Sequence, residues 1–386
     1  MEEAASLANM TVVFVSLNPD SHLSMSSQNS QRFPELRAAG TPTEIGHSIG
    51  EHFRTEILEL TEVVIERFNK GSEHPVNWDH VAPASKVMVS RVAKYFPEYM
   101  EEVEATARAS GTTVEKLMVL NARNMLGSVR SEGCTSIMVG SKASQTGNGL
   151  VGQNWDNDPA MRPFSAVITR EPTNGSRSMS WTQPGLISYI GMNDKGLGIC
   201  LNALNGPNNT EGVPWYFFVR SILDSDSIEK AVSSLDSAPR SISASAAMIS
   251  REGPVNLEIT PDVVHPIWSS NEERQIHTNH CVHPGLITNN EEYSENIYGQ
   301  SFDRKSRAEA LIIDSSPNRE ISVKEVTTAL SDHAGYPTSI CRHPNDHSIT
   351  GWQRSVISIL MEPDAGIMLI APGNPCENEY ETYLLN

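Results

Sequence analysis

The sequence predicts an α+β fold in which a mostly helical first part precedes a part rich in short strands. Helix signals fill the segment 41–130, whereas short β-branched runs separated by turn residues begin beyond Ser131. Helical patterns return at about 215–235, 301–314 and 322–331. Because helices and strands occur in groups and do not alternate regularly, the pattern favours α+β layering over a parallel sheet built from βαβ units.

The first helix has the clearest signal. Thr41 is followed by Pro42 and, three residues on, by Glu44, which together form a capping box with proline at the first helical position. Apolar residues then recur every three or four positions up to Gly71, so we expect one amphipathic helix across this segment. The stripe consists of Ile45, Ile49, Phe53, Ile57, Leu60, Val64 and Phe68. Further helices are expected from Ser85, Pro97 and Thr112.

Two hairpins are expected in the second part. Thr135–Val139 and Leu150–Asn154 flank Thr146-Gly147-Asn148-Gly149, and a second pair of runs, 355–361 and 367–371, brackets Asp364-Ala365-Gly366. Glycine and asparagine between β-branched runs are the usual hairpin signal. Further strands are expected at 12–17, 165–169, 197–201, 244–250 and 257–260, and the polar segment 21–30 is expected to be irregular.

Composition excludes several classes of function. The chain has 386 residues and a net charge of −18, with 38% hydrophobic and 20% charged residues. A field of that sign opposes nonspecific binding to nucleic acid or to an anionic membrane. No run approaches the roughly 18 apolar residues that a membrane span needs. We therefore expect a folded acidic protein with no nucleic-acid or membrane partner.

The ends of the chain and its cysteines indicate a cytoplasmic location. Met1-Glu2-Glu3-Ala4 lacks the basic start of a secretory signal, and the last residues are not a peroxisomal tripeptide of the Ser-Lys-Leu type. Five cysteines in a chain of this length do not suggest a disulfide scaffold: Cys134, Cys200, Cys281, Cys341 and Cys376.

The most suggestive chemistry lies at the junction between the two parts, Ser131-Glu132-Gly133-Cys134-Thr135-Ser136. Glycine allows backbone conformations that are closed to other residues, and a thiol beside a strained carbonyl can attack it. Hydrolysis of the resulting thioester would free the α-amine of Cys134, whose ordinary pKa of about 7.7–8.0 suits a base near neutral pH. Taken alone, a cysteine at a strand start such as Cys134 is more often a buried small hydrophobe.

Several segments around and beyond this junction resemble one known family. Gly133-Cys134-Thr135-Ser136, the hairpin, and then Gly152-Gln153-Asn154-Trp155-Asp156 are similar to the acyl-coenzyme A:6-aminopenicillanate acyltransferase family of cysteine N-terminal-nucleophile hydrolases. Three further segments agree and occur in the family's order: Thr43-Glu44-Ile45-Gly46-His47, His277-Thr278-Asn279-His280 and Pro337-Thr338-Ser339-Ile340-Cys341-Arg342. The resemblance runs from about residue 41 to the C-terminus.

The resemblance implies a four-layer αββα sandwich and self-cleavage between Gly133 and Cys134. Residues 1–133 would then be a mostly helical N-terminal chain, and residues 134–386 the catalytic chain, with the two remaining together as one structural unit. Cys134 would be the nucleophile, Asn279 the oxyanion donor, and Asp156 and Arg342 polar residues of the substrate site.

Each implied role has a physical basis and an alternative. An asparagine amide is a suitable neutral donor for a developing oxyanion, although Asn279 can instead be a turn or cap residue. Asp156 can hold the new ammonium group of Cys134, and Arg342 can bind a substrate carboxylate through its planar fork. The alternative for the last two residues is a structural ion pair.

A metal site is a rival interpretation. His277, His280, Cys281 and His283, with Asp332, His333 and His343 later, are potential ligands. The common zinc spacings are absent, because the chain has neither a CxxC pair nor an HExxH motif. We therefore expect no metal and no cofactor, with a coenzyme A thioester only as a potential substrate.

Three hypotheses for function follow. The first is a self-processing acyltransferase or amidohydrolase that acts on C–N bonds of small N-acyl compounds through an acyl-enzyme on Cys134, with a small acyl donor, an acceptor and its own cleaved N-terminal chain as partners. The second is a catalytically silent scaffold of the same fold. The third is a metal-dependent hydrolase that uses His277, His280 and His283.

Overall fold

The computed structural model describes residues 32–69, 75–126, 133–269, 273–292, 295–315, 319–346 and 351–386. The expected strand at 12–17 and the polar segment 21–30 lie outside the described residues, as do Gly71 and Ser131-Glu132. Within the described part, residues 32–386 form one compact unit.

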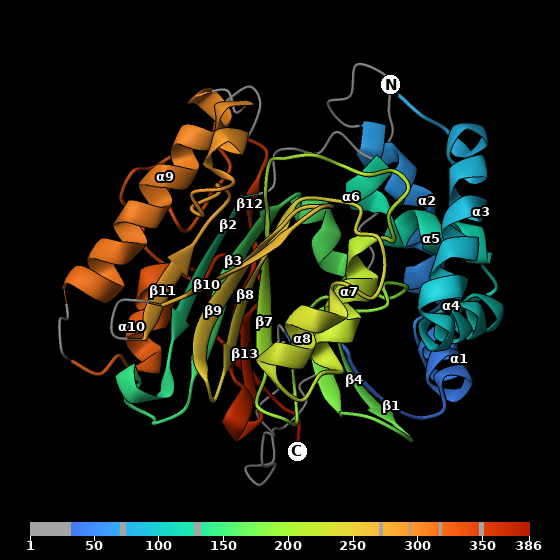
Figure 1. Ribbon diagram of the computed structural model, residues 1–386, viewed down its shortest axis with the longest axis horizontal. Helices are drawn as coiled ribbons and strands as arrows, with labels where there is room; N and C mark the ends of the chain where they lie inside the picture. The colour runs from blue at the N-terminus through green and yellow to red at the C-terminus, as the bar shows by residue number, and fades with distance from the viewer. Residues whose placement is uncertain are drawn as a thin grey trace, which may run out of the picture. The chain divides into compact units, whose positions relative to one another are not determined.

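Two antiparallel-rich sheets form the centre of this unit (Figure 1). The larger sheet has the order β1-β4-β5-β6-β7-β8-β9-β10, and the smaller has the order β11-β2-β3-β12-β13-β14. The strands of the larger sheet are β1 Glu35–Gly40, β4 Ala166–Pro172, β5 Ser178–Thr182, β6 Ile190–Asn193, β7 Gly198–Ala203, β8 Ala244–Ser250, β9 Gly253–Ile259 and β10 Val264–Trp268. Those of the smaller sheet are β2 Gly133–Val139, β3 Leu150–Asn157, β11 Arg274–His277, β12 Arg354–Glu362, β13 Ile367–Ala371 and β14 Glu381–Leu384.

Helices cover the outer face of each sheet. Strands β2 and β3 of the smaller sheet contact β7 and β8 of the larger one, so the sheets face each other. On the smaller sheet, α9 contacts β2 and β11, and α10 contacts β3; on the larger, α1 contacts β1 and β4, and α7 contacts β6. The helices are α1 Pro42–His52, α2 Arg54–Asn69, α3 Trp78–Tyr95, α4 Pro97–Ser110, α5 Val114–Asn121, α6 Arg123–Leu126, α7 Trp215–Leu223, α8 Ile228–Ser234, α9 Glu295–Glu309 and α10 Val323–Leu330. This arrangement confirms the α+β class and the αββα layering.

The helix starts follow the capping chemistry of the sequence, with three corrections. Helix α3 begins at Trp78 behind the Asn77 cap, and not at Ser85 as expected. The Thr41–Glu44 box caps α1 in both directions. The expected single helix is in fact two helices, because the helix is interrupted at Phe53 between α1 and α2. The described apolar side chains of the stripe are nevertheless all buried. The cap of α5 is Thr113, whose hydroxyl accepts from the N–H of Lys116, and not Thr112 as expected.

Helices α1 and α4 pack closely because α1 carries two glycines on the facing side. A Cβ on Gly46 would collide with the carbonyl oxygen of Glu102, and one on Gly50 would collide with that of Thr106. Both glycines are therefore required by close approach of the two backbones. Gly46 belongs to the Thr43–His47 segment noted in the sequence, so the need for a glycine in that segment is explained by helix packing.

The two expected hairpins form, and several strands escape prediction. β2 pairs with β3, and β12 pairs with β13. The strands missed are β1, β5, β6, β10, β11 and β14, all of which are four to six residues long. Strands this short carry too few residues for a period-2 pattern to stand out. The missed strand β1 is important, because it pairs in parallel with β4 and so joins the segment before Cys134 to the sheet beyond it.

Aromatic side chains connect the two sheets and the helical layer. Trp155 of β3 meets Trp181 of β5 at a ring-centroid distance of 5.1 Å, and Tyr189 contacts both rings. Tyr189 in turn meets Tyr216 of α7 at 5.2 Å in an edge-to-face arrangement. Because these rings are almost fully buried, they fix the spacing of the layers on one side of Cys134.

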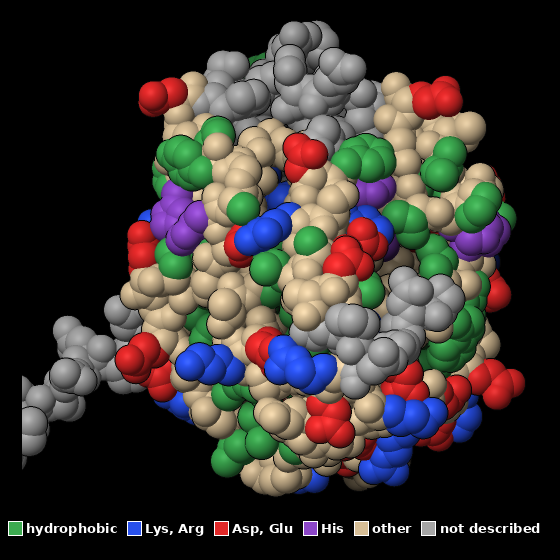
Figure 2. Space-filling model, turned by 90° about the vertical axis from the view of Figure 1, so that its left-hand side faces the viewer, with side chains coloured by type: hydrophobic (Ala, Val, Ile, Leu, Met, Phe, Trp, Pro, Cys, Tyr) green, Lys and Arg blue, Asp and Glu red, His purple; other side chains and the backbone are tan. Residues whose placement is uncertain are grey.

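The face on the side of α9 and α10 is a mixed surface. Figure 2 shows hydrophobic side chains in separate small groups, with acidic and basic side chains between them. No described helix is both long and apolar enough to cross a membrane.

A buried charge network joins the N-terminal helices to the larger sheet. Glu102 of α4 accepts 2.9 Å contacts from Arg170 of β4 and from Arg220 of α7. Burial alone would raise the pKa of Glu102, but the two guanidinium groups lower it below its ordinary value. The carboxylate therefore neutralises two arginines that have almost no access to water.

We predict that Glu102→Gln lowers the free energy of unfolding by about 3–5 kcal/mol, because it leaves the buried guanidinium group of Arg170 without an ion-pair partner and leaves Arg220 with Asp224 alone. Urea denaturation of the purified chain measures this. Glu104→Gln is the matched control, since the Glu104–Arg108 pair is exposed and 3.9 Å long. Equal losses in the two variants would contradict a structural role for the buried network.

Candidate active site around Cys134

The register of β2 and β3 decides where the side chains at the junction point. Gly133 lies opposite Asp156, and Cys134 lies opposite Trp155. Opposite residues share a face of the sheet and successive residues alternate. Since Trp155 meets Trp181 of the other sheet, Cys134 faces the space between the sheets. Gly133 and Asp156 face the layer of α9 and α10.

The backbone of Cys134 is held on both sides. Its N–H donates to Oδ1 of Asn279 over 2.8 Å. Its carbonyl oxygen accepts a 2.5 Å hydrogen bond from Nη1 of Arg304, which also donates to the hydroxyl of Thr135. The second amino group of Arg304 donates to the same Oδ1 of Asn279 over 2.9 Å. One guanidinium group therefore links the start of β2 to the Asn279 segment, and Cys134 is only 1% exposed.

Gly133 is glycine because of space and not because of strain. Its φ is not among the positive values found at other glycines of the described chain, which corrects the expectation of an unusual backbone conformation. A Cβ built on Gly133 would lie 2.9 Å from Oδ2 of Asp156 and 3.2 Å from the guanidinium carbon of Arg342. The Asp156–Arg342 pair thus lies directly against the residue that precedes Cys134.

Asp156 and Arg342 come together, as the sequence led us to expect, although 186 positions separate them. Nε of Arg342 is 3.8 Å from Oδ2 of Asp156, and neither atom has a hydrogen-bond partner among the described residues. The other carboxylate oxygen accepts a 2.7 Å hydrogen bond from the hydroxyl of Ser355. Arg342 also donates to the side-chain oxygens of Gln353 and, over 2.6 Å, Gln300.

Asp156 is an incompletely compensated carboxylate. Burial raises its pKa above the ordinary value, and the opposing charges of Arg342 and Arg304 offset this only in part. Burial likewise lowers the pKa of Arg304 to about 10, and the neighbouring charge of Arg342 adds to that effect. The site therefore holds an acceptor oxygen that a further cation would satisfy.

Asn279 lies beside Cys134, but its amide is turned differently from the expected oxyanion role. The N–H of Cys134 and Arg304 both require an acceptor, so the carbonyl oxygen of Asn279 faces them. The NH₂ group donates to the carbonyl oxygen of Ala203 over 3.1 Å. In the uncleaved chain, Asn279 thus holds the Cys134 amide.

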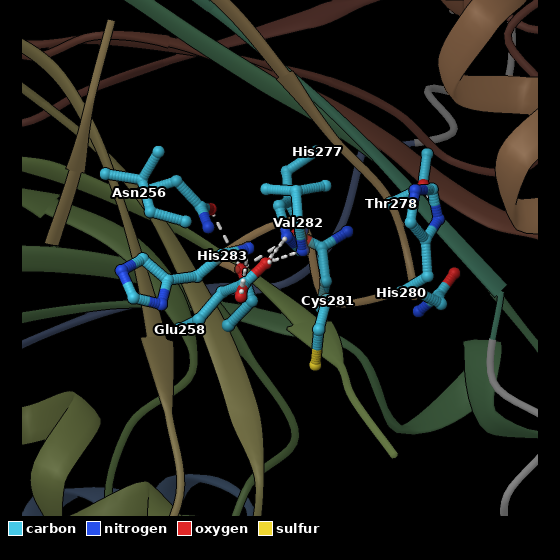
Figure 3. Close-up of polar contacts among 12 residues, drawn as sticks. Asn256, Glu258, His277, Thr278, His280, Cys281, Val282 and His283 are labelled. Carbon is cyan, nitrogen blue, oxygen red and sulfur yellow. Dashed lines mark hydrogen bonds and ion pairs between the residues drawn. The ribbon is translucent and has the colours of Figure 1, made fainter. Parts of the chain in front are cut away.

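Glu258 holds the segment that carries Asn279 (Figure 3). Its carboxylate accepts from Nε2 of His277 over 3.0 Å, from the N–H of Val282 over 2.6 Å and from the N–H of His283 over 3.0 Å. Burial acts to raise the pKa of Glu258, but these donors lower it below its ordinary value. Glu258 on β9 therefore fixes the chain on both sides of Asn279.

The histidines that suggested a metal-dependent hydrolase do not converge. His277 bonds to Glu258 and contacts Ser245, whereas His280 contacts Ser301. The ring of His283 stacks on that of His265 at 3.8 Å. Among the described residues, the potential metal ligands that do converge are His333 and His343 of the expected list, together with Cys341 and Cys376. A catalytic metal on His277, His280 and His283 is therefore not what this arrangement provides.

Comparison with known proteins agrees with this geometry. Residues 144–377 match the model of the family described as acyl-coenzyme A:6-aminopenicillanic acid acyl-transferase. The chain belongs to this family. The matched region includes Asp156, Asn279 and Arg342, and it begins ten residues after Cys134. The acyltransferase family is thus established independently of the Gly133–Cys134 pair.

Individual relatives extend the likeness along the chain. The acyl-coenzyme A:6-aminopenicillanic-acid-acyltransferase 40 kDa form of Emericella nidulans is 26% identical over 358 residues, covering 89% of this chain and 94% of the relative. Among solved structures, a variant of conjugated bile acid hydrolase from Clostridium perfringens is 14% identical with a TM-score of 0.46, covering 66% of this chain and 97% of that one. Penicillin V acylase from Agrobacterium tumefaciens is 12% identical with a TM-score of 0.38, covering 62% and 83%.

Several residues of the candidate site were missed in the sequence. Arg304 is the most important, and it occurs in Asp303-Arg304-Lys305, which resembles a solvated helix face. The only available signal was that Ser301, Arg304 and Ala308 recur at helical spacing, and all three are buried. The other missed residues hold Asp156 or Arg342: Gln300, Gln353 and Ser355.

His280 gives the site a testable dependence on pH. Burial lowers its pKa to about 3, and the charges of His277, Lys305 and Arg304 add to the effect while Glu258 opposes it. Since this folded value lies below the ordinary 6.5, the unfolded chain binds the proton more readily. The contribution of neutral His280 to the free energy of unfolding is therefore fully present above pH 6.5 and is lost as pH falls towards 3.

We predict that the free energy of unfolding falls between pH 6 and 4.5 by up to about 1.4 kcal/mol per pH unit through His280 alone. His280→Gln removes the titrating group, so its stability should depend less steeply on pH over this range. Denaturant melts at several pH values measure both slopes. His47→Gln, at an exposed position, is the control. Identical slopes for the wild type and His280→Gln would refute this assignment.

Proposed function

We propose that the chain is a self-processing cysteine acyltransferase or amidohydrolase that cleaves its own Gly133–Cys134 bond and then carries acyl groups on Cys134. The observation that supports it best is the set of contacts around this one peptide bond. Asn279 accepts from the Cys134 N–H, Arg304 donates to the Cys134 carbonyl, and the Asp156–Arg342 pair lies against Gly133. A buried bond with partners on each side has the environment that intramolecular acyl transfer needs.

The proposed cleavage proceeds in two steps. The sulfur of Cys134 attacks the carbonyl carbon of Gly133, so that a C–S bond forms, the C–N bond breaks and the thiol proton passes to the departing nitrogen. Water then attacks the thioester, which leaves a carboxylate on Gly133 and restores the thiol on Cys134. The fixed orientation of the Cys134 amide favours the first step, because it removes rotational freedom before the sulfur attacks.

Asp156 has a proposed role after cleavage. Its Oδ2 lacks a hydrogen-bond partner among the described residues and lies beside Gly133. The new ammonium group of Cys134 would bring a positive charge and donors to this end of the site, and the carboxylate can accept from them. In its neutral form the amine then serves as the base that takes the proton of the thiol.

Asn279 is the proposed oxyanion donor in acyl transfer, and Arg342 the proposed ligand of the substrate. For Asn279 this requires its NH₂ group to exchange the carbonyl oxygen of Ala203 for the substrate oxygen. For Arg342 the proposed role requires that Gly133 move away after cleavage, so that the space beside the guanidinium group opens. Gly133 now occupies this space so closely that a Cβ on it would touch the guanidinium group. Both conditions are met only by the cleaved enzyme.

The proposed substrates are small acyl compounds. The relative from Emericella nidulans acts, by its name, on acyl-coenzyme A and 6-aminopenicillanic acid. We propose a coenzyme A thioester or an N-acyl amide as the acyl donor here, and an amine or water as the acceptor. Arg342 makes a carboxylate-bearing acceptor the preferred class, since its planar fork matches a carboxylate.

The two proposed chains, 1–133 and 134–386, would remain associated after cleavage. β1 of the first pairs with β4 of the second along six residues. The Glu102 network adds charged contacts between the same two parts. Because the Glu102 network is buried and β1 is hydrogen-bonded into the sheet, loss of one peptide bond would not release either contact.

We predict that the purified chain yields two fragments, one ending at Gly133 and one starting at Cys134, of roughly 15 and 28 kDa. Cys134→Ala should remain one chain, because the attacking sulfur is absent. Intact mass spectrometry and N-terminal sequencing measure both. Cys200→Ala is the matched control, since Cys200 is also a buried cysteine on a strand. An uncleaved wild type with full acyl-transfer activity would contradict the proposal. An uncleaved and inactive wild type would favour the hypothesis of a catalytically silent scaffold.

We predict that Asp156→Asn slows acyl transfer by the cleaved enzyme about 10–100-fold, because the amide keeps the shape but loses the charge that holds the Cys134 ammonium. Steady-state kinetics and thermal melts of the same samples separate this from unfolding. Asp364→Asn, at a pair near the surface, is the control. A lowered melting temperature with normal turnover per folded molecule would mean that Asp156 is only a structural brace.

A further inference from the structure

Four potential metal ligands converge beside the segment that carries Arg342. They are His333, Cys341, His343 and Cys376, and their ligand atoms all lie within 4.8 Å of one another. Nε2 of His343 is 3.1 Å from Nε2 of His333, 3.7 Å from the sulfur of Cys341 and 3.3 Å from that of Cys376. The two sulfurs are 3.6 Å apart.

These separations match the edges of a tetrahedral zinc site. With Zn–S bonds of about 2.3 Å and Zn–N bonds of about 2.0–2.1 Å, a regular tetrahedron has edges of about 3.8 Å between sulfurs, about 3.4 Å between nitrogens and about 3.5 Å between unlike ligands. The four separations given above, out of the six edges of the tetrahedron, each fall within about 0.3 Å of these values. Two thiolates with two imidazoles are also a ligand set that zinc favours.

Neighbouring side chains support the ligands from outside. Nδ1 of His343 is 3.5 Å from a carboxylate oxygen of Glu377, which leaves Nε2 for the metal. The NH₂ group of Asn374 donates to the sulfur of Cys341 over 3.3 Å. Arg354 holds both of these partners, at 2.9 Å from Asn374 and 3.1 Å from Glu377. A carboxylate behind a ligating histidine is the usual outer shell of a zinc site.

We propose that His333, Cys341, His343 and Cys376 bind one Zn²⁺ ion in a structural site. On binding, the two thiols lose their protons to solvent and become thiolates, while both imidazoles bind in the neutral form through Nε2. All four positions come from the protein, so no coordination site is left for a substrate, as in structural zinc centres. His333 and Cys376 are exposed, which gives the ion a path from solvent.

A disulfide between Cys341 and Cys376 is the competing use of these residues. Both are free thiols in this structure. A disulfide would account for the two sulfurs but not for two histidine rings whose Nε2 atoms point at each other and at the sulfurs.

The proposed metal would position the segment of Arg342. Cys341 immediately precedes Arg342 in the segment before β12, and Cys376 lies beyond the end of β13, so the ion would fasten two loops at the same end of the paired strands β12 and β13. Asn374 already bridges them, since it donates to the sulfur of Cys341 and to the carbonyl oxygen of Arg342. This inference is independent of the proposed self-cleavage, because zinc binding can be measured whether or not the chain is cut.

The test uses the full-length chain, purified without an immobilised metal column. We expect about one zinc per chain by inductively coupled plasma mass spectrometry. Cys376→Ser and His333→Ala should each lose most of it, and both positions are exposed, so the variants should still fold. His283→Ala, at a histidine outside the cluster, is the control that keeps its zinc. Replacement by Co²⁺ should give visible d–d bands and sulfur-to-cobalt charge-transfer bands, which Cys376→Ser weakens.

Three results would overturn the proposal. The first is a chain that contains no stoichiometric zinc and takes up none from solution. The second is a Cys341–Cys376 disulfide found by peptide mapping under non-reducing conditions in freshly prepared protein. The third is a zinc content that is the same in the wild type and in both cluster variants. The same holds for equal contents of another metal bound in place of zinc.

Discussion

The pairing of β2 with β3 is the constraint on which the rest of the candidate site depends. Its register sets Gly133 opposite Asp156 and Cys134 opposite Trp155. A shift by one residue would exchange the two faces of β2 and move Cys134 away from the space between the sheets. The register is secured by burial of every residue in both strands. Arg304 and Asn279 then bind a backbone whose position the sheet has already determined.

The buried charges of the site have the same physical logic as those of the scaffold, with one difference. In the Glu102 network, two arginines give one carboxylate a partner for each oxygen. At Asp156, the nearest guanidinium atom stays at 3.8 Å and one oxygen has no hydrogen-bond partner among the described residues. Such an unmet acceptor costs free energy unless another group completes it. It is the point at which a cleaved chain would differ most from the uncleaved one.

Much of the fold was predictable, because its signals are local. Capping residues such as Thr41 and turn residues such as Gly366 act within a few positions, and strands β8 and β13 matched expectation residue for residue. Short strands such as β11 were missed, since their place is decided by partners far along the chain. The break at Phe53 was missed for a related reason, because the apolar stripe continues unbroken through it.

The site was predictable only where a motif marked it. Cys134, Asp156, Asn279 and Arg342 were found through short motifs, and the structure brings them together, but their orientations depend on tertiary contacts. Arg304 looks in sequence like any arginine on a solvated helix, although it is 3% exposed. The Cys341 and Cys376 pair was likewise invisible, because ligand spacing was sought in compact motifs and these residues lie 35 positions apart.

Trapping of the acyl-enzyme tests whether Cys134 carries the acyl group. The cleaved protein is mixed briefly with an acyl-coenzyme A thioester, quenched in acid, digested and mapped by tandem mass spectrometry. We predict an acyl group on the sulfur of Cys134, in a peptide that begins with Cys134. Acylation of another cysteine, or turnover of the thioester with Cys134 unmodified throughout, would contradict it.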